Sequence, residues 1–148
     1  MKGTSVFIAG IIQGSIPSSQ VHAQDYRRMI TEIIAKHLEG ARVYCPFQNH
    51  QNSLEYDDLT ASKVFFDHIT MASRADLLVT YLPEASMGTA VEMFAAHQAG
   101  RAIVTISPMS VNWTVRFLSH RMLDGLEEFE RFAAEGGLRE LLDEHYGP

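Results

Sequence analysis

A serine, a glycine and a glutamate follow a strongly apolar segment near the middle of the chain. The apolar segment covers residues 76–82, and Ser86, Gly88 and Glu92 come soon after it, at the start of an alanine-rich stretch. This order predicts a buried strand, a turn, and a glutamate in the first turn of a helix. In open parallel sheets, ligands bind where strands end and helices begin, and the positive helix end favours anions. We therefore expect Glu92 to be ionised, as a carboxylate nucleophile must be.

A second loop that contains glycine follows the first apolar segment and includes Gly10, Gln13 and Gly14. It lacks the G-x-G-x-x-G spacing of dinucleotide sites and the Gly-Lys-Ser/Thr of ATP-binding loops, so we expect no cofactor. Its backbone N–H groups still suit a sugar or a single phosphate. Both loops should lie on the carboxyl edge of the sheet, which would place this one beside Ser86 and Glu92.

Strand-sized apolar runs alternate with segments of helical periodicity along the chain. This alternation predicts a Rossmann-like (flavodoxin-like) α/β fold, with a parallel sheet of four to five strands and helices on both faces. The expected strands are 5–9, 42–45, 76–82 and 102–107. The expected helices are 26–38 with a cap at Ser18 or Ser19, one around 61–72, 88–99 and 113–123. Helix-forming residues continue from Leu126 without a clear fifth strand, and residues 47–58 form a long polar loop.

Composition limits the class of protein. A chain of 148 residues with 46% apolar residues is expected to form one domain, 1–148, and its apolar runs are too short to cross a bilayer. The net charge of −6, with scattered basic residues, argues against binding to a nucleic-acid polymer. The first strand begins at once and Cys45 is the single cysteine, so we expect no signal peptide and a cytoplasmic location.

The segment 75–92 resembles the signature of the nucleoside 2-deoxyribosyltransferase family, which includes the 2'-deoxynucleoside 5'-phosphate N-hydrolases. The opening Phe7-Ile-Ala-Gly10 is similar to the family's first strand, and the resemblance covers roughly residues 5 to 123. It implies that Glu92 attacks the anomeric carbon of a nucleoside or nucleotide, expels the base and forms a covalent ribosyl ester. An acceptor base then gives transfer, whereas water gives hydrolysis.

The resemblance also implies further substrate contacts. Ser86 falls where the hydrolase branch has a phosphate-binding serine, and Ser119 resembles a serine that a neighbouring subunit contributes in that branch. Asn112 and Trp113 lie in the region that reaches across a subunit interface in the family. Helices with small or apolar outer residues, together with the region from Asn112 to Ser119, predict a homodimer or a larger homo-oligomer with shared sites.

Three positions depart from the family pattern. The family aspartate is expected eight positions before Asp76, where this chain has His68, with Asp67 one residue earlier. An ideal helix places His68 on its apolar face, so either a one-residue bulge presents Asp67 or His68 has taken the role; we favour Asp67 as the second catalytic residue. Phe7 replaces a tyrosine, and Gln13 replaces an arginine that contacts phosphate, which removes a charged donor.

Amide side chains are concentrated in residues 48–52, and amides both donate and accept hydrogen bonds, so this segment is the candidate for reading a base edge. The histidines lack the spacing of metal ligands, so no metal is expected. Two other functions stay open: a phosphoribohydrolase of the cytokinin-activating type, whose Gly-Gly-x-Gly-Thr-x-x-Glu turn residues 86–92 resemble loosely, and a non-catalytic nucleotide sensor.

Overall fold

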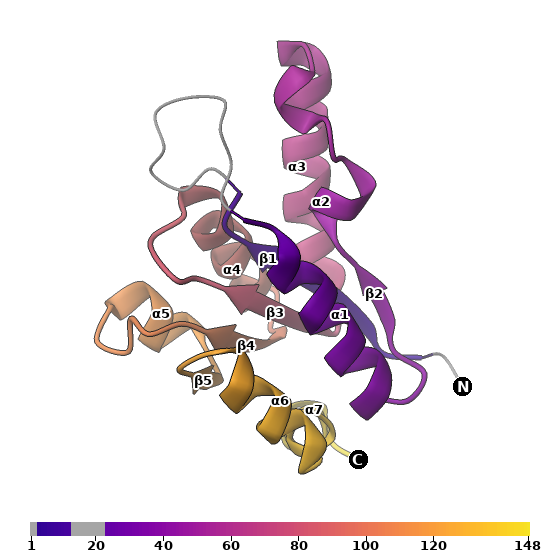
Figure 1. The fold of residues 1–148 in the computed structure, drawn as a ribbon, viewed down its shortest axis with the longest axis vertical. Coiled ribbons are helices and arrows are strands. Elements are labelled where there is room, and N and C mark those ends of the chain that lie inside the picture. The colour runs from indigo at the N-terminus through magenta and orange to yellow at the C-terminus, as the bar shows by residue number, and fades with distance from the viewer. Residues whose placement is uncertain (1–2, 13–22) are drawn as a thin grey trace.

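Five parallel strands form one sheet in the order β2-β1-β3-β4-β5 (Figure 1). The computed structural model describes residues 3–12 and 23–148. The strands are β1 (Ser5–Gly10), β2 (Arg42–Tyr44), β3 (Leu77–Tyr81), β4 (Ala102–Ile106) and β5 (Arg121–Leu123). This is the strand order of flavodoxin-like sheets, in which the order reverses between β1 and β3. The predicted fold class is confirmed.

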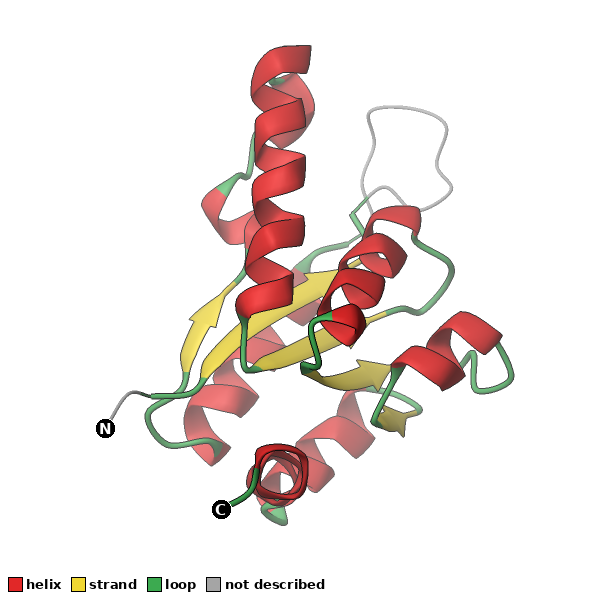
Figure 2. Cartoon of the chain, turned by 180° about the vertical axis from the view of Figure 1, so that it is seen from behind, coloured by secondary structure: helices red, strands yellow, loops and turns green. Residues whose placement is uncertain are grey.

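Helices cover both faces of the sheet (Figure 2). One face carries α1 (Asp25–His37), α6 (Leu126–Ala134) and α7 (Gly137–Tyr146), and the other carries α3 (Asp58–Arg74), α4 (Met87–Gln98) and α5 (Trp113–Leu118). The short helices α2 (Pro46–Asn49) and η1 (Ser53–Glu55) connect β2 to α3. Figure 1 shows α3 extending well beyond the sheet at the end where α2 lies. No helix in the described part of the chain is long and apolar enough to cross a membrane.

The central strands are buried on both sides, which explains their continuous apolar runs. Val79 and Ile103 are fully buried and point to opposite faces, where they join two separate core layers. Phe129 of α6 completes one layer and Met93 of α4 the other. The sheet is therefore a rigid base, and the loops that follow β1 and β3 leave it at the same edge.

The predicted helix 113–123 is wrong over its last residues. The helix α5 ends at Leu118, Ser119 is already extended, and β5 pairs in parallel with β4, with Met122 opposite Thr105. A strand of three residues is too short to show a periodicity of its own, so pairing with β4 decides its conformation. The fifth strand thus lies where the sequence suggested a helix.

Two connections also differ from expectation. The segment 47–58 contains α2 and η1, and Pro46 begins α2 because proline suits the first position of a helix. The helix α1 begins at Asp25, with Gln24 before it. The expected cap residues Ser18 and Ser19 lie outside the described residues.

Candidate active site

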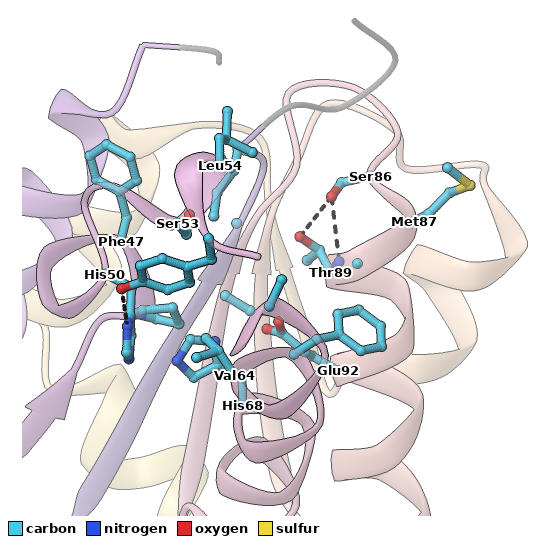
Figure 3. Close-up of a pocket in the computed structure, with 18 of the residues that line it drawn as sticks. Phe47, His50, Ser53, Leu54, Val64, His68, Ser86, Met87, Thr89 and Glu92 are labelled. Atoms are coloured by element: carbon cyan, nitrogen blue, oxygen red, sulfur yellow. Dashed lines mark hydrogen bonds between the residues drawn. The ribbon is translucent and has the colours of Figure 1, made fainter. Parts of the chain in front are cut away.

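A pocket of about 610 Å³ opens at the carboxyl ends of β1 and β3, where the strand order reverses (Figure 3). The predicted residues Gly10, Ser86, Gly88 and Glu92 all line it. They come from two loops more than seventy residues apart in sequence, and the parallel pairing of β1 with β3 brings these loops together. The place is the one where open α/β sheets bind ligands.

The N-terminus of α4 forms one wall of this pocket. Ser86 caps the helix: its hydroxyl accepts a hydrogen bond from the Thr89 backbone N–H at 3.4 Å and lies 3.0 Å from the Thr89 hydroxyl (Figure 3). A Cβ added to Gly88 would meet no atom within 4 Å, so space remains above the helix end. The wall therefore offers hydroxyls, helix N–H groups and room for a polar ligand.

Glu92 lies in the second turn of α4 rather than the first, and it is half-buried in the pocket. Burial raises its pKa from 4.5 to about 7, and the positive charge of Arg27 opposes this rise. The expectation of a carboxylate fully ionised at neutral pH is therefore wrong. The favourable field of a helix end fades beyond the first turn, so the loss of water dominates.

The structure separates Asp67 from His68. Asp67 is exposed, pairs with Lys63 one helical turn away, and does not line the pocket. His68 is buried, lines the pocket from α3, and its Nε2 lies 3.1 Å from the Tyr44 hydroxyl. Because α3 runs through this region as a regular helix, no bulge turns Asp67 inward. Of the two alternatives left open, the geometry favours His68.

Burial is the main cause that lowers the pKa of His68 to about 4, and the nearby His50 adds to it. The imidazole is therefore neutral at pH 7. A neutral imidazole has one donor and one acceptor nitrogen, so it can hydrogen-bond to a hydroxyl of a sugar. His68 can thus orient a ligand, whereas a ring with so low a pKa is a poor proton donor.

The amide-rich segment 48–52 does not form the base-reading wall that we expected. Only His50 of this segment lines the pocket, and its Nδ1 lies 2.9 Å from the Tyr56 hydroxyl. The Asn49 side chain instead donates to the Cys45 carbonyl at 2.8 Å. Phe47, just before the segment, supplies an aromatic face to the pocket.

Sequence reasoning missed Arg27. This residue lines the pocket, yet it is only 1% exposed. A usable signal existed, because positions 27, 30 and 34 lie on one face of a helix and Ile30 and Ile34 are fully buried. Arg28, the next residue, is exposed, so the two adjacent arginines looked like part of an ordinary basic surface.

The remaining predicted residues lie elsewhere. Asn112 caps α5 by accepting from the Val115 N–H at 3.2 Å, and the Ser119 hydroxyl lies 2.6 Å from that of Thr105. Neither lines the pocket of its own chain. Gln13 and Gly14 lie outside the described residues. Within the described ranges, no group of three or more His, Cys, Asp or Glu side chains is placed to hold a metal ion.

Solved structures share this fold. A 2-deoxyribosyltransferase from Bacillus psychrosaccharolyticus matches with a TM-score of 0.65 and 16% identity, over 86% of this chain and 90% of that one. A CMP N-glycosidase from Clostridium botulinum matches with a TM-score of 0.52 and 18% identity, over 86% of this chain and 95% of that one. A conserved protein from Enterococcus faecalis matches with a TM-score of 0.52 and 17% identity, over 96% of each chain. No protein-family model and no curated protein matches the sequence.

Proposed function

We propose that this chain cleaves or transfers the N-glycosidic bond of a nucleoside or nucleoside 5'-monophosphate, with Glu92 as the nucleophile. The observation that carries the proposal is the position of Glu92, which enters a pocket at the sheet's switch point between the helix end at Ser86 and the ring of His68 (Figure 3). Two solved proteins of this fold are named a 2-deoxyribosyltransferase and a CMP N-glycosidase, and both names describe reactions at such a bond. This supports the choice of reaction.

The proposed reaction has two displacements. In the first, a carboxylate oxygen of Glu92 bonds to the anomeric carbon, the carbon–nitrogen bond breaks, and its electron pair leaves with the base, which takes a proton from solvent. In the second, water or an acceptor base attacks the same carbon and loses a proton to solvent, while the ester bond breaks and its electron pair returns to the Glu92 carboxylate. Only ionised Glu92 starts the first step, so the rate should rise with pH through the pKa of about 7.

The test is a panel of ribo- and deoxyribonucleosides and their 5'-monophosphates, with and without an acceptor base. Free base, measured by chromatography, indicates hydrolysis, and a new nucleoside indicates transfer. Cleavage of ribonucleotides alone would favour the phosphoribohydrolase. Tight binding of a nucleotide without any turnover would favour the sensor and contradict the proposal.

The second contact to the sugar is proposed for His68, with Asp67 as its matched control. Replacing His68 with alanine should lower kcat/KM by about 10- to 100-fold, because one hydrogen bond to the substrate is worth about 1–3 kcal/mol. Replacing Asp67 with asparagine should change it less than about twofold, because that side chain faces solvent. Thermal melts of both variants check that they fold. The reverse order of effects would return the role to Asp67.

We also propose that the chain forms a homo-oligomer through the face made by α3, α4 and α5, seen in front in Figure 2. Large apolar side chains are exposed along this face: Phe66 at 62%, Met87 at 84%, Val91 at 43%, Phe94 at 56%, Trp113 at 74% and Phe117 at 61%. Exposed apolar side chains concentrated on one face typically mark an interface. It also carries the region of Asn112 and Ser119, which the resemblance places in a shared site.

Replacing Phe94 with serine should therefore lower the molecular mass measured by sedimentation velocity at micromolar concentration. Met29, an exposed methionine on α1 at the opposite face, provides the control, and Met29→Ser should leave the mass unchanged. A wild-type chain that sediments as a monomer would contradict the proposal. It would also remove Asn112 and Ser119 from the site.

A further inference from the structure

Arg27 holds a positive charge in the pocket, and no carboxylate of the described chain forms a salt bridge with it. Its side chain donates to the Gln24 amide oxygen at 2.7 Å, to the Cys45 sulfur at 3.3 Å and to the Gly10 carbonyl at 3.0 Å. It forms no salt bridge with any carboxylate in residues 3–12 and 23–148. A buried charge without a counter-charge is costly, so its presence calls for an explanation.

The surroundings of Arg27 fix its position firmly. Its guanidinium carbon lies 5.0 Å from the centre of the Tyr26 ring and 5.8 Å from that of Phe47, within the range of cation–π attraction. Gly10, whose carbonyl accepts from Arg27, has to be glycine, because a Cβ at this position would come within 2.4 Å of the Tyr26 hydroxyl oxygen. The charge is thus held in place by an aromatic pair and by the end of β1.

Glu92 is the group on which this charge can act. Burial also raises the pKa of Tyr26 well above its usual value, so the phenol next to Arg27 stays neutral. The other titratable residues that line the pocket are Tyr56, Asp58 at the exposed start of α3, and His50 and His68, the latter neutral at pH 7. The strands β1, β3 and β4 and the helix α5 place no titratable side chain among the described lining residues.

We propose that Arg27 is a positioning residue for the reaction: it supplies the fixed positive charge that lets Glu92 ionise at its partly buried position in the pocket. The charge acts across the pocket without a direct ion pair, since Coulomb attraction in a poorly screened site extends beyond contact distance. A direct pair would bind the carboxylate and lower its reactivity. The effect of Arg27 on catalysis rests on the proposed function, in which Glu92 is the nucleophile. The effect of Arg27 on the ionisation of Glu92 does not depend on that function.

The test measures the ionisation of Glu92 directly. Carbon-13 NMR of glutamate-labelled protein follows each carboxyl carbon with pH, and the spectrum of Glu92→Gln assigns the signal of Glu92. In Arg27→Gln the Glu92 signal should titrate at least about one pH unit higher than in the wild type, because an opposite charge nearby shifts a carboxyl pKa by about 1–3. In Arg27→Lys, which keeps the charge, the pH at which the Glu92 signal titrates should stay within about half a unit of the wild-type value.

Arg28→Gln is the matched control, because it makes the same change one residue along the helix on an exposed side chain. It should leave the Glu92 titration unchanged. An equal titration of Glu92 in wild type and folded Arg27→Gln would overturn the proposal, as would an equal shift in Arg28→Gln. If Arg27→Gln does not fold, Arg27→Lys decides, because a Glu92 signal that moves up by a unit despite the retained charge contradicts a role for the charge.

The pH profile of base release gives a second measurement. Arg27→Gln should lose about tenfold in kcat/KM near pH 6.5, yet approach the wild type within a few-fold above about pH 9, where Glu92 is ionised in both. A merely structural role would lower activity by the same factor at every pH. Absence of base release by the wild type would defeat the proposed function alone, because the NMR titration needs no substrate.

Discussion

Replacing Glu92 with glutamine should lower the rate of base release by at least about a thousandfold. Glutamine keeps the size of the side chain but has no oxygen able to form an ester with the anomeric carbon, so the covalent route closes. The pocket, the helix end at Ser86 and the ring of His68 remain, so substrate should still bind with nearly the same dissociation constant. The expected signature is therefore a large fall in kcat with little change in binding.

Two measurements check this prediction. Base release under saturating substrate gives kcat, and the intact mass of acid-quenched protein should show one added sugar, or sugar phosphate, on the wild type and none on Glu92→Gln. Glu32→Gln, an exposed glutamate on α1, is the matched control and should keep full activity. Equal rates of base release in wild type and Glu92→Gln would remove Glu92 from the mechanism.

The site's framework could be predicted because parallel strands are buried on both faces. The apolar run that contains β3 and the capped start of α4 are local features, and together they bring Ser86, Gly88 and Glu92 to the pocket, with Glu92 one turn further along the helix than expected. The loop after β1 joins them through strand pairing, which the alternation of strands and helices already implies.

The chemistry of individual side chains depended on tertiary packing. Helical spacing placed His68 on the apolar face of its helix, but only the packing of α3 in the fold shows that this face lines the pocket and leaves Asp67 in solvent. Helical spacing with Ile30 and Ile34 could have indicated that Arg27 is buried, but the acceptors that hold its guanidinium, in Gly10, Gln24 and Cys45, are set by tertiary contacts.

The ionisation of Glu92 is a further property that sequence alone did not predict. The helix position suggested an easily ionised carboxylate, but burial, which sequence does not report, raises its pKa to about 7. The protein therefore holds a carboxylate at a cost in stability for as long as it is charged. Catalytic sites commonly carry such a cost, because the group that reacts is not the group that best stabilises the fold.

Glu92→Gln should consequently be more stable than the wild type at alkaline pH, and this difference should disappear in acid. Between about pH 4.5 and 7 the folded wild type binds more protons than the unfolded chain, so its free energy of unfolding falls as the pH rises. A pKa raised from 4.5 to about 7 corresponds to a loss of about 3 kcal/mol once the pH is well above 7. Glutamine mimics the protonated side chain and avoids this loss.

Urea unfolding of both proteins at about pH 9 and about pH 5 measures the effect. The gain for Glu92→Gln should be about 3 kcal/mol at the higher pH and less than about 1 kcal/mol at the lower one, because there the folded wild type is already protonated. Glu32→Gln should show no such dependence, since water already surrounds that side chain. A gain that is equal at both pH values would mean that glutamine improves packing. A loss at alkaline pH would mean that the charged carboxylate is stabilised by its surroundings, and the raised pKa of Glu92 would then have to be abandoned.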